Sequence, residues 1–328
     1  MPNVAPAVFS GIIEEFVFKA IQTPFANMPP RDIYAENFDD AIAQEGQVVH
    51  CHQNTTVYGN LNDLANGWES TPPTASNYQA TLKTLGKDHI INVTDYSTIG
   101  EQRILDTFST LGRQVANGVT VNVFNNVTTS SFTNVVTINS SSNFTYTGSN
   151  GLQSIATTLD NLENDQDKRY CILTPNAYSS LVTSNNVFQT LVYGGSEIIR
   201  GNGFKDVDGS DVNGAHPGVK FAGFDIYKYP RLGTLGVRPY GGDKVVTPSL
   251  IGFAGVKSGL FVANRVPMPV NFPMTTNYVY TDPTSKFSLQ FIMGLDFSKP
   301  GIRFGVYTLF GSAAANPNAI VPIITQSN

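Results

Sequence analysis

The strongest hydrophobic pattern in this chain is a run of apolar residues at steps of three and four in its first half. Six residues share this helical period: Ile104, Leu105, Phe108, Leu111, Val115 and Val119. Thr98 and Glu101 precede them at the spacing of a capping box, in which two side chains bond free backbone N–H groups at the helix start. The pattern therefore predicts a long helix over Thr98–Val123.

The positions before this helix predict one short helix and several extended segments. Ser10–Ile21 has its apolar residues on one helix face, and Phe38–Tyr58 has the pattern of strands paired with each other. The stretch from Gly59 to about Lys87 has few periodic apolar residues, so we expect a loop that reaches a neighbouring molecule. His89–Asp95 is predicted to be a short strand.

The second half alternates helix signals with short apolar runs. Gly151–Asn164 has the spacing of an amphipathic helix. The strand Arg169–Leu173 leads to Thr174 at the N-cap and Pro175 at the first helical position. Further strands are expected at Val219–Tyr229 and Leu250–Ala254, followed by a second β set: Lys286–Leu295, Gly301–Leu309 and Ala319–Ile324. The alternation predicts an α+β protein with a central α/β unit inserted between the long helix and the last strands.

A long uncharged stretch separates the long helix from this unit. From Gln114 through Leu159 there is no Asp, Glu, Lys or Arg. Within it, Thr128–Asn150 alternates Ser, Thr and Asn with aromatic and β-branched residues. A disordered linker is the alternative, but regularly placed residues of these types favour a hairpin that ends near Gly148–Gly151.

Composition bears on function more than on fold. Only 14% of the 328 residues are charged, against roughly a quarter in ordinary soluble proteins. Such a chain fits a protein that covers much of its surface with copies of itself. The net charge of −5 and the lack of basic runs argue against a dedicated nucleic-acid binder. No signal peptide and no apolar stretch long enough to span a membrane is found, so we expect no membrane partner.

The candidates for metal or catalytic chemistry are weak. Asp206–Gly214 is rich in oxygen ligands but lacks the glycine and glutamate positions of a calcium loop, so we expect a solvated turn. His50 and His52 share one face of a strand, but sequence supplies no third ligand. Cys51 and Cys171 fit small buried apolar residues. We therefore expect no cofactor, no metal site and no enzyme activity.

Four segments in the chain carry a resemblance to a known family. Thr174–Leu181 is similar to its helix start after a strand, Gly223–Pro230 to a strand that ends in proline, and Ile251–Arg265 to an alanine-rich strand segment. Arg31–Val49 is similar to the arm-to-strand passage of short-tailed phage coat proteins. Taken in order, these segments resemble the major capsid proteins of tailed bacteriophages, which have the Hong Kong 97-like fold.

The resemblance implies a division of the chain. It implies an N-terminal arm and first strand of the peripheral (P) domain, an extended E-loop hairpin with flanking strands, a P-domain spine helix with the uncharged hairpin, an inserted axial (A) domain, and returning P-domain strands with the C-terminus. The expected boundaries are 1–47, 48–96, 97–150, 151–270 and 271–328.

The resemblance also implies a function. Copies of the chain would assemble into hexamers and pentamers of an icosahedral head that encloses double-stranded DNA without sequence-specific binding. Expected partners are a separate scaffolding protein, a portal and a decoration protein, with assembly in the bacterial cytoplasm. Trp68, Arg103 and Arg113 are the expected contacts between subunits. Two alternatives stay open: an encapsulin-like compartment shell, and a secreted β-rich carbohydrate-binding or adhesive protein.

Overall fold

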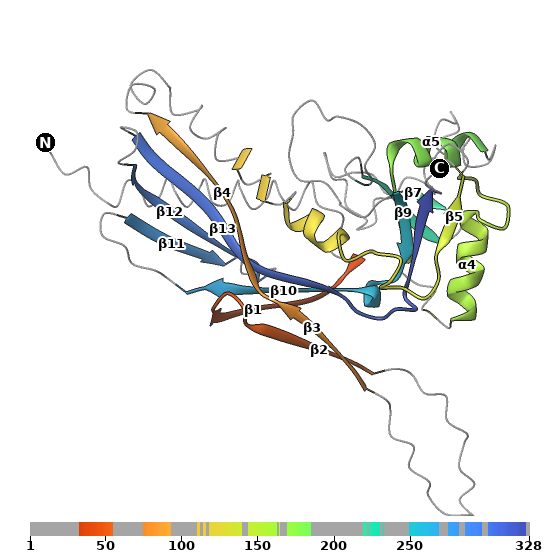
Figure 1. Ribbon diagram of the computed structural model, residues 1–328, viewed down its shortest axis with the longest axis horizontal. Helices are drawn as coiled ribbons and strands as arrows, with labels where there is room; N and C mark the ends of the chain where they lie inside the picture. Colours follow the sequence, from red (N-terminus) through yellow and green to blue (C-terminus); the bar gives the residue numbers. More distant parts are fainter. Residues whose placement is uncertain are drawn as a thin grey trace, which may run out of the picture.

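The computed structural model describes residues 33–54, 75–92, 110–111, 114–115, 118–139, 144–162, 164, 169–184, 219–221, 223–229, 232, 249–268, 275–281, 286–296 and 301–325. These residues form two six-stranded sheets and a two-stranded ribbon. Figure 1 shows the two sheets side by side, with the ribbon extending away from both.

The first sheet is mostly antiparallel and is built around one long strand, β13. Its order is β1 (Ala35–Ala43), β10 (Leu260–Pro267), β13 (Gly301–Ala314), β12 (Ser288–Asp296) and β11 (Thr275–Thr281), with β4 (Lys83–Asn92) also paired to β13. Only β1 and β10 run parallel, and their register shifts between Phe38 and Ile42. Arg265 joins these two strands because its guanidinium donates to the Asn37 carbonyl at 2.6 Å and to the Asn37 side chain at 2.8 Å.

Strand β13 has three partners but only two edges, so two of them share an edge. Leu309 and Phe310 pair with β4 and with β10, which places these two strands on opposite edges. Strand β12 pairs with residues 301–307, a stretch that β4 also lines, so β12 and β10 follow one another along the same edge. The side chain of Asn264 fills the junction between β10 and β12.

Asn264 is fully buried and its amide bonds three strands at this junction. It accepts a hydrogen bond from the Ser288 N–H at 2.7 Å. It donates to the Thr308 hydroxyl at 2.8 Å and to the Leu309 carbonyl at 3.1 Å. Thr308 in turn donates to the Ser288 carbonyl at 3.0 Å. The amide thus replaces the backbone ladder at the point where one partner strand of β13 gives way to the next.

The second sheet carries two helices on one face. Its order is β5 (Val136–Ile138), β14 (Ile320–Thr325), β9 (Leu250–Gly255), β6 (Arg169–Leu173), β8 (Phe224–Lys228) and β7 (Val219–Phe221). Helices α4 (Leu152–Asn161) and α5 (Pro175–Ser184) bury Leu152, Ile155, Leu159, Ala177, Leu181 and Val182 in one core with residues of β6, β8, β9 and β14. The other face of the sheet packs toward the first sheet.

One core joins the two sheets. It contains Phe253 and Tyr170 from the second sheet, Phe291 and Val306 from the first, and Phe124 from the helical residues 118–124. These helical residues, yellow in Figure 1, lie between the sheets. The Phe253 ring lies 5.0 Å from that of Phe124 and 6.1 Å from that of Tyr170, both edge to face. The aromatic contacts therefore hold the second sheet against the helical residues that lie between the two sheets.

Several sequence predictions are confirmed. Helix α4, strand β6 and helix α5 lie where the pattern placed them, and the Ala177 N–H donates to the Thr174 hydroxyl at 3.4 Å as expected of an N-cap. Residues 110–111, 114–115 and 118–124 are helical, as predicted for the second half of the long helix. The capping box at Thr98 and Glu101, and the helix expected at Ser10–Ile21, lie outside the described residues.

Five predictions of pairing or element type are wrong in whole or in part. Strands β1 and β2 (Val48–Asn54) do not pair with each other, because β1 pairs with β10 and β2 with β3 (Ala75–Thr81). Residues 75–81 and 83–87 are strands and not loop. Most of their side chains are polar and the few apolar ones mark a single face, so the sequence carries only a weak strand pattern. The segment Val219–Tyr229 is two strands, because Gly223 turns the chain with a φ of 82°.

The expected hairpin at Thr128–Asn150 does not form in the described part of that segment. Its one strand there, β5, pairs in parallel with β14 instead of with a neighbouring strand of the segment. Of the second β set, β12 and β13 pair as expected, but β14 pairs with β9 and so belongs to the second sheet. Strand pairing over such sequence distances is not visible in local periodicity.

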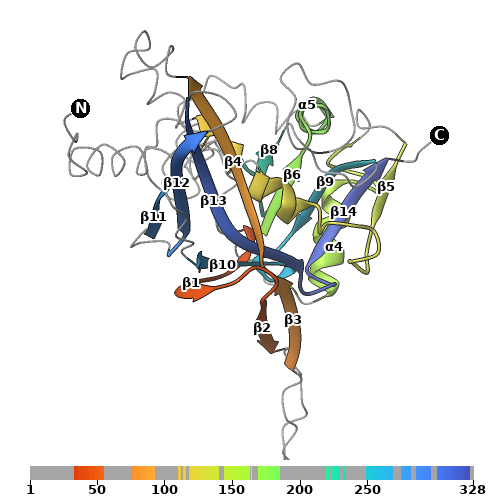
Figure 2. The same ribbon diagram turned by 60° about the vertical axis from the view of Figure 1, so that its left-hand side comes forward.

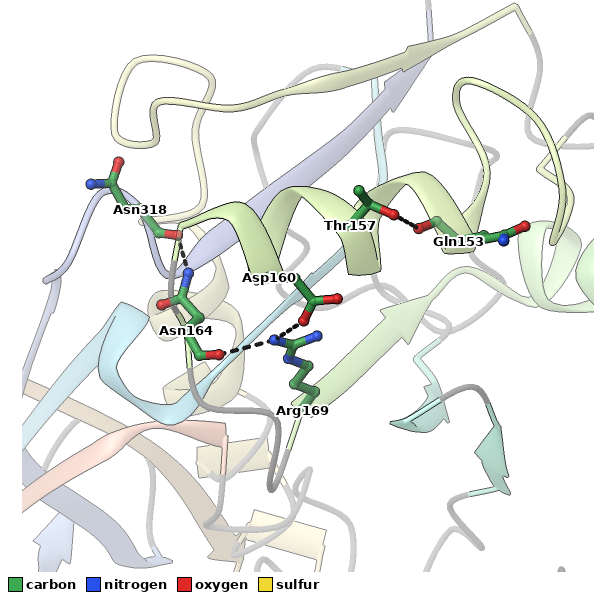
Figure 3. Close-up of polar contacts among 6 residues, drawn as sticks. All are labelled: Gln153, Thr157, Asp160, Asn164, Arg169 and Asn318. Atoms are coloured by element: carbon green, nitrogen blue, oxygen red, sulfur yellow. Dashed lines mark hydrogen bonds and ion pairs between the residues drawn. The ribbon is translucent and has the colours of Figure 1, made fainter.

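An arginine joins helix α4 to the second sheet. The Arg169 guanidinium, almost wholly buried, contacts the Asp160 carboxylate at 2.7 Å and donates to the Asn164 carbonyl at 2.9 Å. The Asn164 amide donates to the Asn318 carbonyl at 2.9 Å, just before β14 (Figure 3). The end of α4, the start of β6 and, through Asn164, the distant segment before β14 are thereby held together around one buried charge.

Removing the Asp160 carboxylate, which pairs with a buried arginine, should cost more stability than removing a carboxylate that pairs with an exposed arginine. Asp160→Ala is expected to lower the free energy of unfolding by about 1–2 kcal/mol, because the buried guanidinium loses its charged partner. Asp88→Ala breaks a contact with Arg303 of 2.8 Å whose side chains are 56% and 39% exposed, and should cost under about 0.5 kcal/mol. Urea unfolding of both variants measures the difference, and equal losses would contradict it.

Candidate intersubunit surfaces

The ribbon formed by β2 and β3 has two different faces. The strands are antiparallel, in register from Val48 opposite Thr81 to Asn54 opposite Ala75. On one face, Val49, Cys51, Tyr78 and Ala80 pack with residues of β10 and β13 on the side of the first sheet away from the helical residues. The other face carries His50, His52, Asn77 and Gln79, all exposed. The ribbon is thus fixed at its base and presents a polar face outward.

The ribbon carries no formal charge along either strand. Its sequences, VVHCHQN and ASNYQAT, contain no Asp, Glu, Lys or Arg. In the described part of the chain each of these strands pairs only with the other, so each has an unpaired edge. Exposed strand edges are usually protected by charged side chains, and the centres of protein interfaces are depleted of charge. An uncharged, projecting ribbon is therefore suited to lie against another protein surface (Figure 2).

The two ribbon histidines lie side by side. Their ring centroids are 6.5 Å apart with an interplanar angle of 13°. The Nδ1 atom of His50 lies 3.1 Å from the Asn77 amide nitrogen and 3.3 Å from its oxygen, so this amide fixes the ring in either tautomer. No cluster of three metal-ligating side chains is found among the residues whose positions are described.

A second surface lies at the base of the ribbon and is apolar. Ile42, Val48 and Met268 are 65%, 44% and 51% exposed and are the large apolar side chains that stand out to solvent in the described structure. They come from the end of β1, the start of β2 and the residue after β10. The backbone N–H of Met268 donates to the Ala43 carbonyl at 3.2 Å, which brings these ends together. We call these three residues the apolar corner.

The expected contact residues cannot be placed on either surface. Trp68, Arg103 and Arg113 lie outside the described residues, as do Asp206–Gly214 and His216. Sequence analysis did not single out Ile42 or Met268. The available signal was an apolar residue between small or proline neighbours at a strand end, which does not distinguish an exposed side chain from a buried one.

The two thiols are not placed for chemistry. Burial raises the pKa of the Cys171 thiol far above its ordinary range, and partial burial raises that of Cys51. Both groups are therefore held as neutral thiols, the unreactive form. Cys171 is buried as expected, whereas Cys51 is only half-buried. Among the described helices none is long and apolar enough to cross a membrane.

The chain is similar in fold to solved shell structures over nearly its whole length. The capsid structure of the cyanophage P-SCSP1u matches with a TM-score of 0.54 and 12% identity, covering 90% of this chain and 88% of that one. The asymmetric unit of the mature capsid of bacteriophage PhiM1 matches with a TM-score of 0.50 and 12% identity, covering 92% and 88%. Comparison with protein-family models finds no match, and neither does comparison with curated protein sequences. At this identity the likeness establishes a capsid-like fold of mixed sheets with few helices.

Proposed function

We propose that this chain is the major capsid protein of a tailed bacteriophage. Its copies would assemble into hexamers and pentamers of an icosahedral head that encloses double-stranded DNA. The observation that carries the proposal is the likeness in fold to two phage capsid structures across about nine-tenths of the chain. The uncharged ribbon and the apolar corner support it, because both are surfaces that a free monomer would expose to water without benefit.

The sheets support a proposed division of the subunit. The first sheet with the helical residues 118–124 would be the peripheral domain, and the second sheet with α4 and α5 the axial domain. The ribbon of β2 and β3 would be the base of the E-loop. Under this division the chain returns to the peripheral domain already at β10 and ends in the axial domain with β14. The sequence instead led us to expect the return to the peripheral domain at residue 271, and the last strand within that domain.

The proposed mechanism of assembly is repeated burial of complementary surface. Each contact between subunits can be weak, because closure of a shell makes every further contact intramolecular. Trp68, Arg103 and Arg113 remain proposed contacts in it. A scaffolding protein, a portal and a decoration protein are the proposed partners. The net charge of −5 favours DNA that is confined by the shell and not bound tightly by it.

Electron microscopy of the expressed chain tests the proposal. The chain is produced in bacteria alone and together with a candidate scaffolding protein, and both preparations are examined by negative stain. Closed icosahedral shells, or uniform hexamers and pentamers, are expected in at least one. A stable monomer in both would overturn the proposal.

The content of shells recovered from their natural source separates a phage head from a compartment. A head is expected to hold double-stranded DNA that becomes sensitive to nuclease only when the shell is opened. A protein cargo with no DNA would instead favour the encapsulin-like alternative.

A further inference from the structure

The apolar corner is held outward by the strands that carry it. Ile42 and Val48 are exposed while their neighbours Ala43 and Val49 take part in the core beneath the ribbon. Successive residues of a strand point to opposite faces, so burying Ala43 and Val49 forces Ile42 and Val48 to the surface. Their exposure follows from the register of the strands.

Hydrogen bonds make the corner a fixed surface. The Gly46 N–H donates to the Leu82 carbonyl at 2.8 Å, and the Leu82 N–H donates to the Gln47 carbonyl at 2.8 Å. Gly46 adopts a φ of 88°, which a residue with a side chain rarely adopts. The Gln44 amide lies 3.2 Å from the Met268 sulfur and holds that side chain against the turn. A partner would therefore meet a surface already in its bound shape.

The corner continues into the outward face of the ribbon. Val48 belongs to the corner and is followed on the same face by His50 and His52. In the segment from Ala41 to Asn54 the single charged residue is Glu45. Corner and ribbon thus form a continuous surface that is apolar at its base and nearly uncharged beyond.

The size of the corner identifies the kind of occupant. Three partly exposed side chains present only a small fraction of the roughly 800 Å² that each partner buries in a stable two-protein complex. A separate protein held by this surface alone would dissociate. A second copy of the chain needs no larger contact area at this surface, because each copy in a closed shell is held by all its other contacts at the same time.

We propose that Ile42, Val48 and Met268 form a contact between subunits that is buried against a second copy of this chain during shell assembly. The inference rests on the proposed function. It adds a specific surface, contributed by the ends of β1 and β10 and the start of β2, to the contacts expected of the ribbon itself.

The test compares polar and apolar replacements at the two most exposed corner positions. The double variant Ile42→Gln with Met268→Gln is expected to raise the protein concentration needed for shell formation by at least about tenfold, measured by sedimentation velocity. The matched control, Ile42→Val with Met268→Leu, keeps the apolar character and should assemble like the wild type. Circular dichroism and thermal melting check that both variants fold.

A labelling experiment detects burial without disturbing assembly. The thiol of Ile42→Cys should react with a maleimide at least about tenfold more slowly in shells formed by this variant than in its free subunits. Labelling of the unsubstituted chain measures the background reaction of the two native cysteines. Equal rates, or normal assembly of the double glutamine variant, would overturn the inference while leaving the proposed function intact. Protection seen only when a scaffolding protein is present would also overturn it, since the occupant would then be that protein. Failure of the wild type to assemble at all would count against the proposed function itself.

Discussion

Replacing Asn264 with alanine is expected to lower the free energy of unfolding by about 3 kcal/mol. The change removes the amide that bonds the Ser288 N–H, the Thr308 hydroxyl and the Leu309 carbonyl, all at a buried junction. Each buried polar group left without its partner costs about 1–3 kcal/mol, and the lost side-chain volume adds a cavity. Guanidinium chloride unfolding measures the loss as a lower midpoint at unchanged slope.

A second asparagine in the same sheet provides the control. Asn277 on β11 accepts a hydrogen bond from the Gln290 amide at 3.0 Å, but it is only half-buried. Asn277→Ala should cost less than about 1 kcal/mol, because water can reach the groups that it leaves. If both variants lose the same stability, the cost at Asn264 does not come from the buried network.

The junction at Asn264 shows which part of the fold could not be predicted from sequence. Leu260–Pro267 is plainly apolar, and the asparagine in its middle has no local pattern to explain it. Its role depends on β12 and β10 sharing one edge of β13, and Ser288 and Thr308 are 24 and 44 residues away. Local periodicity predicts that an element exists and which face it buries, but not which distant strand it will meet.

The elements that were predicted well are those whose signals are local. Helix α5 follows from Thr174 and Pro175 at its start, and α4 from apolar residues at helical spacing. The ribbon strand β3 was missed because ASNYQAT has only Tyr78 and Ala80 to mark its buried face. The outward face of the ribbon and the apolar corner could not be predicted from sequence. Which of their side chains are exposed depends on how the strands pair and not on any one segment.

Replacing Phe253 with alanine is expected to have the largest effect of any single change proposed for this subunit. The side chain is fully buried at the contact between the two sheets, with Phe124 and Tyr170 edge to face against it. Phenylalanine-to-alanine changes in cores cost about 3–5 kcal/mol, which is a large part of the 5–15 kcal/mol that holds a typical domain together. Thermal unfolding should show a lower midpoint.

The control keeps the aromatic contact and removes only a hydroxyl. The Tyr170 hydroxyl is buried and has no hydrogen-bond partner among the described residues. Burial without a partner raises the pKa of this phenol far above its usual range. Tyr170→Phe should therefore leave stability within about 1 kcal/mol of the wild type or raise it. A loss as large as that of Phe253→Ala would show that the hydroxyl, and not the ring packing, holds the sheets together.

The same pair of variants connects the fold to assembly. A closed shell requires every copy to keep the relative angle of its surfaces within a narrow range, and the Phe253 cluster lies between the sheet that carries the ribbon and the sheet that carries α4 and α5. At a temperature where Phe253→Ala is still folded, we expect few closed shells and many irregular aggregates in electron micrographs, whereas Tyr170→Phe should form shells of normal size. Regular shells from folded Phe253→Ala would mean that contacts between subunits, and not the core within each one, fix the angle between the sheets.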